Sequence, residues 1–288
     1  MKPAAFDYLA PTTLDQAVSL LATAERPAVP LAGGQSLVPL LNARRVRPAT
    51  VIDLNRVLGL DGIRITQDTV MIGATTRLHT LETDAALGAC LPVIAQTVSH
   101  VAHRYIRHRG TCGGSLCHAD PAAQLPASVL ALDARLVLLG PRGTRVVAAE
   151  DFFQGPHLTA LGPDELLTSV EIPRRPHARH RFEEVPRRGS ANGPLVGVCV
   201  TVGLDGPVVT SARIAAAGVA DRPLRLRDAE HALIGHPIDG VPDTVARTAA
   251  ASVAPSDDLH AGADYRAAML RVVIRRALAR MAVERSSP

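Results

Sequence analysis

Aromatic residues are scarce in this 288-residue sequence: they make up 2% of the chain, and tryptophan is absent. A flat ligand therefore has no aromatic cage to enter, and we expect the backbone and aliphatic side chains to hold it. Cysteine is also rare, with four residues that form neither a C-x-x-C motif nor a spaced disulfide framework. No apolar run approaches the roughly 18 residues of a membrane span, and the N-terminus lacks the apolar region of a signal peptide. We therefore expect a cytoplasmic, reduced protein with no membrane span.

Several nucleotide-binding and catalytic motifs are missing as well. The sequence contains no G-x-x-x-x-G-K-[ST], which excludes a P-loop, and no G-x-G-x-x-G, which argues against a standard Rossmann site. It also lacks the G-x-S-x-G elbow of an α/β-hydrolase. The formal net charge is only +4, and basic residues come in pairs such as Arg44-Arg45 and Arg275-Arg276 instead of one block. Because a nucleic-acid reader needs a concentrated basic face, we expect no nucleic-acid partner.

Hydrophobic residues, at 47% beside 20% charged residues, are abundant enough to build the cores of two or three domains. A first unit, residues 1–56, has the order helix, short strand, glycine loop, helix and strand. Its first helix follows two threonines that can cap it, and Ala17, Val18 and Leu21 stand at helical spacing. Ser36 is predicted to cap the second helix.

The second unit, residues 57–175, alternates short strands and helices. We predict two strands around a turn at 66–68, a helix within 91–102, a helix that runs into a hairpin at 141–143, and a strand that ends at Pro173. The order of these elements indicates a mixed α and β region.

A change of composition follows. Residues 173–194 are rich in Arg, Pro and Gly, which predicts a linker or a mobile loop. The Arg-rich stretch 174–188 within it is alternatively a surface that docks a partner. The last unit, residues 176–288, is predicted to be α+β. It has a hairpin around Asp205-Gly206 and helices at about 225–235 and 264–283.

Two glycine pairs stand in similar surroundings, AGGQSL at residues 32–37 and CGGSL at residues 112–116. Adjacent glycines adopt conformations closed to other residues and let a ligand touch the chain. Where such a pair precedes a helix, free N–H groups bind anions. The hydroxyls of Ser36, Thr111 and Ser115 would add hydrogen bonds to a phosphate. One pair alone indicates a tight turn, whereas two similar pairs predict a pyrophosphate site divided between two loops.

The histidines and cysteines around the second pair offer two other interpretations. Zinc accepts such ligands, but structural zinc sites show tight ligand pairs, and Cys112 and Cys117 have no second pair. The residues considered as ligands are His100, His103, His108, Cys112, Cys117 and His118. A nucleophilic Cys117 beside His118 or His103 needs an orienting third group, which the sequence does not place. We favour buried, inert cysteines, and we predict no metal site and no catalytic acid or base.

The chain resembles a known family in two long segments, LAGGQSLVPLLNARRVRPATVIDLNRV and IRHRGTCGGSLCHADPAAQLPA. Four shorter segments follow the same order: IGATTRLHTLE, DELLTSVEIP, GVADRPLRLRDAEHALIG and ADYRAAMLRVVIRRAL. The family is the FAD-binding medium subunit of the molybdenum hydroxylases, the group of xanthine dehydrogenase and carbon monoxide dehydrogenase. The resemblance implies an α+β fold. A two-part FAD-binding domain of the vanillyl-alcohol-oxidase type (1–56 and 57–175) would precede a small α+β C-terminal domain of the CO dehydrogenase flavoprotein type (176–288).

The resemblance also implies which residues hold FAD. One group would wrap the pyrophosphate from one side: Ala32, Gly33, Gly34, Gln35, Ser36 and Leu37. A second group would wrap it from the other: Thr111, Cys112, Gly113, Gly114 and Ser115. The remaining positions that contact the cofactor or hold the site are Val101, Ala102, Asp120, Gln124 and Leu167. Asp120 is equally suited to bind a hydroxyl and to hold its own turn.

Two positions depart from the family's pattern. Relatives often have an acidic residue at the position of Gln124, where it hydrogen-bonds a sugar hydroxyl. Glutamine accepts that bond without a charge, so we expect weaker binding. Many relatives have Gly-Asp and an aromatic residue near the isoalloxazine, whereas this chain has Asn192-Gly193. A more open flavin face is expected, and the identity of the electron acceptor stays open.

By this resemblance, the chain is an oxidoreductase flavoprotein, the FAD-carrying electron-transfer subunit of a heterotrimer. [2Fe–2S] clusters would lie on a small Fe–S subunit and the molybdenum cofactor on a large subunit, assembled as a dimer of heterotrimers. Electrons from the hydroxylation of an N-heterocycle, an aldehyde or CO would pass through the clusters and FAD to an external acceptor. Two alternatives are a non-catalytic FAD-binding or assembly protein of the same fold, and a stand-alone flavin oxidase with His79 or His118 as its base.

Overall fold

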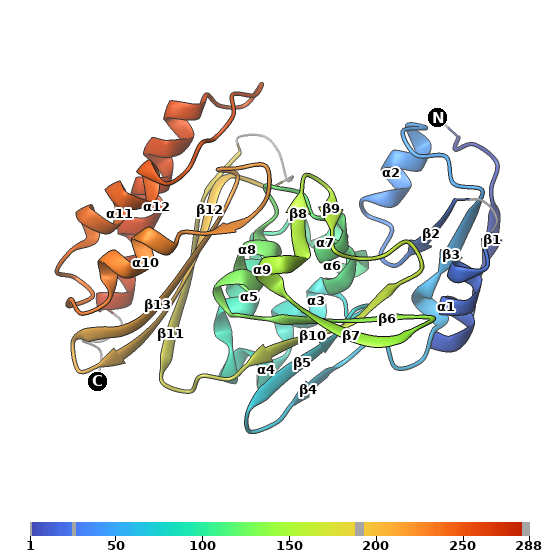
Figure 1. Ribbon diagram of the computed structural model, residues 1–288, viewed down its shortest axis with the longest axis horizontal. Helices are drawn as coiled ribbons and strands as arrows, with labels where there is room; N and C mark the ends of the chain where they lie inside the picture. The colour runs from blue at the N-terminus through green and yellow to red at the C-terminus, as the bar shows by residue number, and fades with distance from the viewer. Residues whose placement is uncertain (1, 25–26, 188–192, 284–288) are drawn as a thin grey trace.

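The chain forms three successive regions in the computed structural model, which describes residues 2–24, 27–187 and 193–283 (Figure 1). The first region holds strands β1 to β3, the middle region β4 to β10 and the C-terminal region β11 to β14. Each region has its own main cluster of buried hydrophobic side chains. Within the described ranges, no helix combines the length and the apolar character needed to cross a bilayer.

A small parallel sheet of order β1-β3-β2 forms the first region. The elements are β1 (Asp7–Leu9), α1 (Leu14–Ala22), β2 (Ala28–Leu31), α2 (Leu37–Asn42), β3 (Thr50–Asp53) and the 3-10 helix η1 (Leu54–Arg56). The first predicted helix is confirmed, because the hydroxyl of Thr13 caps α1 by accepting a hydrogen bond from the N–H of Gln16. Its apolar stripe is buried as the spacing predicted. β1 escaped prediction because all three of its residues are exposed and show no apolar alternation.

An antiparallel sheet of order β4-β5-β10-β6-β7 is the centre of the middle region. Its strands are β4 (Ile63–Ile65), β5 (Thr69–Gly73), β6 (Arg135–Gly140), β7 (Gly143–Ala148) and β10 (Leu166–Pro173), with a separate ribbon of β8 (Phe153–Gly155) and β9 (Leu158–Thr159). Its helices are α3 (Leu78–Thr83), α4 (Ala85–Cys90), α5 (Pro92–Ser99), α6 (Arg104–Arg109), α7 (Cys112–His118), α8 (Gln124–Ala131) and α9 (Ala149–Phe152). Both predicted hairpins and the strand ending at Pro173 are confirmed.

The C-terminal region is an antiparallel sheet of order β11-β12-β13-β14 covered on both faces. Its elements are β11 (Ala178–Pro186), β12 (Pro194–Asp205), β13 (Val208–Ala217), β14 (Leu224–Arg225), α10 (Arg227–Leu233), α11 (Pro242–Ala251) and α12 (Ala263–Val283). Helices α10 and α12 pack on one face, with α11 packed against these two helices, and α5 and α8 of the middle region pack on the other face (Figure 1). This explains why β12 is apolar over most of its length, without the alternation of a half-exposed strand.

Within its described residues, 174–187, the Arg-rich stretch is not a linker, so that prediction was wrong there; residue 188 lies outside the described residues. Nine of its residues, Ala178–Pro186, form β11 and pair with β12. Four of its arginines are bonded within the molecule. Arg174 and Arg175 donate to the middle region, Arg179 donates to a carbonyl of α12, and Arg181 pairs with Glu183 at 2.9 Å. These bonds occupy four of the arginines, and the hypothesis of a docking surface stays a prediction.

Helix α11 was also missed, although its sequence carries a signal. Pro242 stands in its first turn, and Val245, Ala246 and Ala249 form its buried face at helical spacing. The other two helices of this region, α10 and α12, lie where they were predicted.

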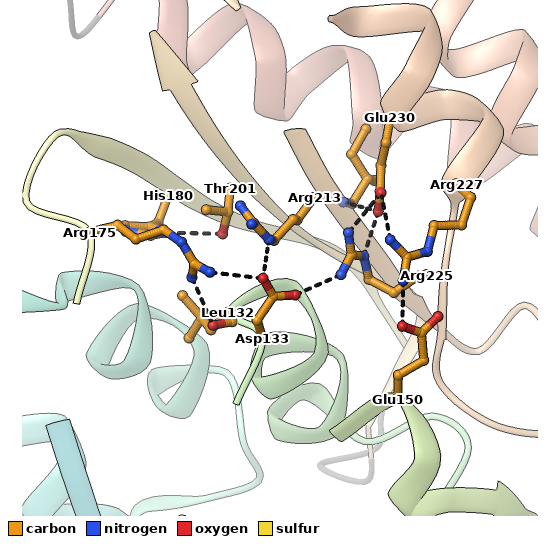
Figure 2. A network of polar contacts seen from close by, with 11 residues as sticks. Leu132, Asp133, Glu150, Arg175, His180, Thr201, Arg213, Arg225, Arg227 and Glu230 are labelled. Atoms are coloured by element: carbon orange, nitrogen blue, oxygen red, sulfur yellow. Dashed lines mark hydrogen bonds and ion pairs between the residues drawn. The ribbon is translucent and has the colours of Figure 1, made fainter. Parts of the chain in front are cut away.

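A polar network joins the middle region to the C-terminal region (Figure 2). Asp133, in the turn before β6, accepts hydrogen bonds from three guanidinium groups, those of Arg175, Arg213 and Arg225. Arg225 also makes two hydrogen bonds to the carboxylate of Glu230 in α10. Since Arg213 and Arg225 belong to β13 and β14, one carboxylate holds the C-terminal sheet against the middle region.

Candidate cofactor site

The first glycine pair lies in the turn that joins β2 to α2. Gly34 has a φ of +74°, in the left-handed region that favours glycine. Within the described part of the chain, the N–H groups of Gly33, Gly34, Gln35 and Ser36 have no acceptor. Ser36 precedes α2 as predicted, but its side chain makes no capping hydrogen bond. Successive N–H groups and a hydroxyl are therefore available to an anion.

The second glycine pair is the first turn of helix α7, and not the loop that the sequence suggested. Thr111 caps this helix, and its hydroxyl accepts the N–H of Gly114 at 3.1 Å. The N–H groups of Cys112 and Gly113 donate to carbonyls in the turn after β5, at 2.9 and 2.8 Å. The expectation of free N–H groups was therefore wrong for this half of the site. It offers an anion the positive end of the helix and the hydroxyl of the partly exposed Ser115.

The two glycine segments lie against each other. A Cβ added at Gly33 would stand 2.2 Å from the carbonyl oxygen of Arg109 and 2.8 Å from Cα of Gly110, directly before the second pair. A Cβ added at Gly114 would stand 3.9 Å from Cβ of Ala32. No larger residue fits at Gly33, because the atoms it would meet are backbone. The fold thus brings together the two halves that the sequence predicted, and glycine is what permits their close approach.

Val101 and Ala102, just after α5, are tied to the second half through α6. The guanidinium of Arg107 donates to both of their carbonyls at 3.0 Å. Arg107 also makes two hydrogen bonds to Glu82, of 2.8 and 3.0 Å. Partial burial would raise the pKa of Glu82, but the hydrogen bonds and the charge of Arg107 hold this pKa below its ordinary value. Because α6 ends at Arg109, two residues before Thr111, this ion pair fixes Val101 and Ala102 relative to the second glycine pair.

Asp120 and Leu167 take structural positions. Oδ1 of Asp120 accepts the N–H of Ala122 at 2.9 Å, which holds the turn between α7 and α8. Leu167 of β10 is 4% exposed, and its side chain belongs to the core of the middle region. Leu37, the first residue of α2, is partly exposed beside the first glycine pair.

Gln124 is itself buried, in a polar cluster with Glu184 and the exposed His100 that the sequence did not reveal. Its Nε2 donates to the carbonyl of His100 at 3.0 Å and to Oε2 of Glu184 at 3.2 Å. The other oxygen of Glu184 lies 3.4 Å from Nδ1 of His100. Hydrogen bonding to Glu184 raises the pKa of His100, against the opposing effect of burial. A carboxylate is thus present beside Gln124, but it is that of Glu184 in β11. Because Glu184 is far from Gln124 in the sequence, no spacing pattern could reveal it. Asn192, the other departure, lies outside the described residues.

The sulfur and imidazole groups do not form a reactive centre. Burial raises the pKa of the Cys112 and Cys117 thiols to about 12, so neither is a thiolate at neutral pH. His100 ends α5 and His103 precedes α6, so they do not share one helix face. Among the described residues, no three His, Cys, Asp or Glu side chains are placed to hold a metal ion.

The two histidines considered as flavin-oxidase bases each lie against another imidazole, with the ring planes tilted by 41°. The ring centroids of His79 and His108 are 3.9 Å apart, and those of His118 and His157 are 4.6 Å apart. Burial lowers the pKa of His118. These contacts hold each ring against a neighbouring side chain of the same protein.

Two family models match the chain. One, described as the FAD binding domain in molybdopterin dehydrogenase, matches residues 4–175, and the other, the CO dehydrogenase flavoprotein C-terminal domain, matches residues 180–281. The two glycine segments therefore lie within an FAD-binding domain. The chain belongs to the family of FAD-binding subunits of the molybdopterin dehydrogenases, and it is an oxidoreductase flavoprotein of the xanthine dehydrogenase group.

Two relatives match along nearly their whole length. The chain is 37% identical to the caffeine dehydrogenase subunit beta of Pseudomonas sp. (strain CBB1), over 98% of this chain and 96% of the relative. It is 38% identical to the 6-hydroxypseudooxynicotine dehydrogenase complex subunit alpha of Paenarthrobacter nicotinovorans, over 100% and 98%.

Solved structures give the same result for the fold. A chain of the Cu,Mo-CO dehydrogenase superposes with a TM-score of 0.94 at 36% identity, covering 98% of this chain and 99% of that one. A chain of quinoline 2-oxidoreductase from Pseudomonas putida 86 superposes with a TM-score of 0.93 at 33% identity, covering 99% of each. The α+β fold class expected from the resemblance, a two-part FAD-binding domain followed by a small C-terminal domain, is confirmed.

Proposed function

We propose that this chain is the electron-transfer subunit of a heterotrimeric molybdenum hydroxylase, with FAD held between the two glycine segments. The observation that carries the proposal is the close approach of Gly33 to the backbone before the second pair, beside N–H groups that have no acceptor in the described chain. A pyrophosphate is a doubly charged anion that such a two-sided backbone cradle fits. The site residues named from the resemblance remain part of this proposal.

The chain's own residues have a positioning role in this function. The N–H groups from Gly33 to Ser36 would donate to one phosphate, and α7 with the Ser115 hydroxyl would stabilise the other. Buried aliphatic side chains in place of aromatic rings would exclude water around the isoalloxazine. Bound FAD supplies redox chemistry in one- and two-electron steps, which suits a link between iron–sulfur clusters and a two-electron acceptor. No acid or base of this chain is required.

Partners and substrate follow from the relatives and belong to the proposal. Relatives carry the names of caffeine, glyceraldehyde and carbon monoxide dehydrogenases and of a nicotine 6-hydroxylase. These names support an N-heterocycle, an aldehyde or CO as the substrate of a partner's molybdenum site. We propose a small Fe–S subunit and a large molybdenum subunit as partners, in a dimer of heterotrimers in the cytoplasm. The division into residues 1–56, 57–175 and 176–288 is retained on the same basis.

The test is to purify the full chain, record its visible absorption, and identify the released flavin by mass spectrometry. We expect the absorption bands of oxidised flavin and a cofactor with the mass of FAD. A folded chain that carries no flavin and takes up no added FAD would contradict the proposal and favour a non-catalytic role. Co-expression with Fe–S and molybdenum subunits should then give electron transfer from the partner's substrate to an added acceptor dye. A flavoprotein that oxidises a substrate alone would instead favour a stand-alone oxidase.

A further inference from the structure

A chain of hydrogen bonds connects the two glycine segments. Nδ2 of Asn55, in η1, donates to the carbonyl of Ala32 at 2.9 Å. Oδ1 of Asn55 accepts a hydrogen bond of 2.6 Å from the guanidinium of Arg77. The other terminal nitrogen of Arg77 donates to the carbonyl of Arg109 at 2.6 Å. Arg109 is the residue whose carbonyl faces Gly33. The chain of bonds therefore joins the two halves of the FAD clamp, which are residues 32–37 and residues 109–115.

Both ends of this connection are held in place. At one end, Oδ1 of Asp53 accepts hydrogen bonds from the N–H and Nδ2 of Asn55, and its Oδ2 accepts a hydrogen bond from the hydroxyl of Tyr8. These bonds fix which side of the Asn55 amide faces Arg77. At the other end, the backbone of Arg77 forms a β-bridge with Thr111, the cap of α7. Arg77 is therefore part of the second half through its backbone and reaches the first half through its side chain.

We propose that Asn55 and Arg77 are positioning residues that set the separation of the two halves of the FAD clamp. A cofactor that contacts both halves binds more tightly when their spacing is fixed beforehand, since binding then costs less ordering of the loops. The planar guanidinium suits this role because its two terminal nitrogens donate in fixed directions, to a side chain of one half and to a carbonyl of the other. This inference rests on the proposed function.

The test compares FAD dissociation constants of the full-length chain after removal of bound flavin. Arg77→Ala and Asn55→Ala should each weaken FAD binding by about 10- to 100-fold, and Arg77→Lys should recover only part of it. Because either substitution breaks the same connection, the double variant should lose no more than Arg77→Ala alone. At saturating FAD, the circular dichroism of the bound flavin should change, which a general loss of stability would not produce.

Arg174→Ala is the matched control. Arg174 also clasps backbone carbonyls, those of Thr66 and Gln67 at 2.6 and 3.3 Å, but in the β4–β5 turn and with no link to either glycine segment. The Arg174→Ala variant should have the same FAD dissociation constant as the unmodified chain. Asn55 is exposed, so Asn55→Ala keeps the test valid if Arg77→Ala does not fold.

Three outcomes would overturn the positioning role: unchanged FAD binding in folded Asn55→Ala, additive losses in the double variant, or an equal loss in Arg174→Ala. An unmodified chain that binds no FAD would overturn the proposed function instead, which separates the two failures.

Discussion

Replacing Gly33 with alanine tests whether the two glycine segments must touch. The added Cβ would lie 2.2 Å from the carbonyl oxygen of Arg109 and 2.8 Å from Cα of Gly110. These are backbone atoms, which cannot rotate away as a flexible side chain can. Since carbon and oxygen approach to about 3.3 Å, the two segments must separate by roughly 1 Å.

This displacement has consequences for stability and for binding. An overpacked contact costs about 1–3 kcal/mol of the free energy of unfolding. A shift of roughly 1 Å also breaks N–H contacts to a phosphate, each of which contributes about 1.5–3 kcal/mol when charge-assisted. Loss of one or two such bonds amounts to about 3 kcal/mol, so the dissociation constant for FAD should rise by roughly 100-fold.

The assay is a fluorescence titration of flavin-free protein with FAD, together with a thermal melt. Gly88→Ala is the control, because an added Cβ there meets no atom within 4 Å and alanine is the better helix former. We expect Gly88→Ala to bind FAD normally and to melt no lower than the unmodified chain. If Gly33→Ala bound FAD like the unmodified chain, the close approach of the two segments would not be what shapes the site.

Three other experiments test polar contacts of the C-terminal region. Gln124→Glu should weaken FAD binding by about tenfold, because the new carboxylate takes the place of Nε2, which lies 3.2 Å from the carboxylate of Glu184. The double variant Gln124→Glu, Glu184→Gln should recover the FAD affinity. Tighter FAD binding by Gln124→Glu alone would refute this repulsion. Asp133→Ala leaves three guanidinium groups without their shared carboxylate, so the free energy of unfolding, measured in urea, should fall by about 2 kcal/mol. An unchanged urea midpoint of unfolding would show that the network does not stabilise the fold. Burial, with the charges of nearby arginines, lowers the pKa of His180 to about 4. As the pH falls below about 6.5, His180 is therefore protonated in the unfolded chain while it stays neutral in the folded chain. The free energy of unfolding should drop by about 2 kcal/mol between pH 7 and pH 5. His180→Gln should flatten this dependence, and an equal slope in that variant would assign it to other groups.

Local patterns predicted the elements whose side chains face one core. The stripe of Ala17, Val18 and Leu21 with a preceding threonine predicted α1, and the turn residues predicted the hairpin of β12 and β13. The prediction failed at β11, because charged side chains that pair within the molecule give the same composition as a solvated linker. Composition records which charges a segment carries, but not what they face.

The sequence by itself determined the class of site. A divided FAD clamp could be predicted from two glycine pairs with neighbouring hydroxyls, from the absence of rival nucleotide motifs and from the resemblance to a family. Each of these signals is made of short motifs, whose residues are close together in the chain. The tertiary structure decided what depends on distant residues. It made the second pair a helix start whose N–H groups are largely bonded, placed Glu184 beside Gln124, and linked Asn55 to Arg77. These contacts join separate elements, and no local spacing encodes the packing that brings such elements together.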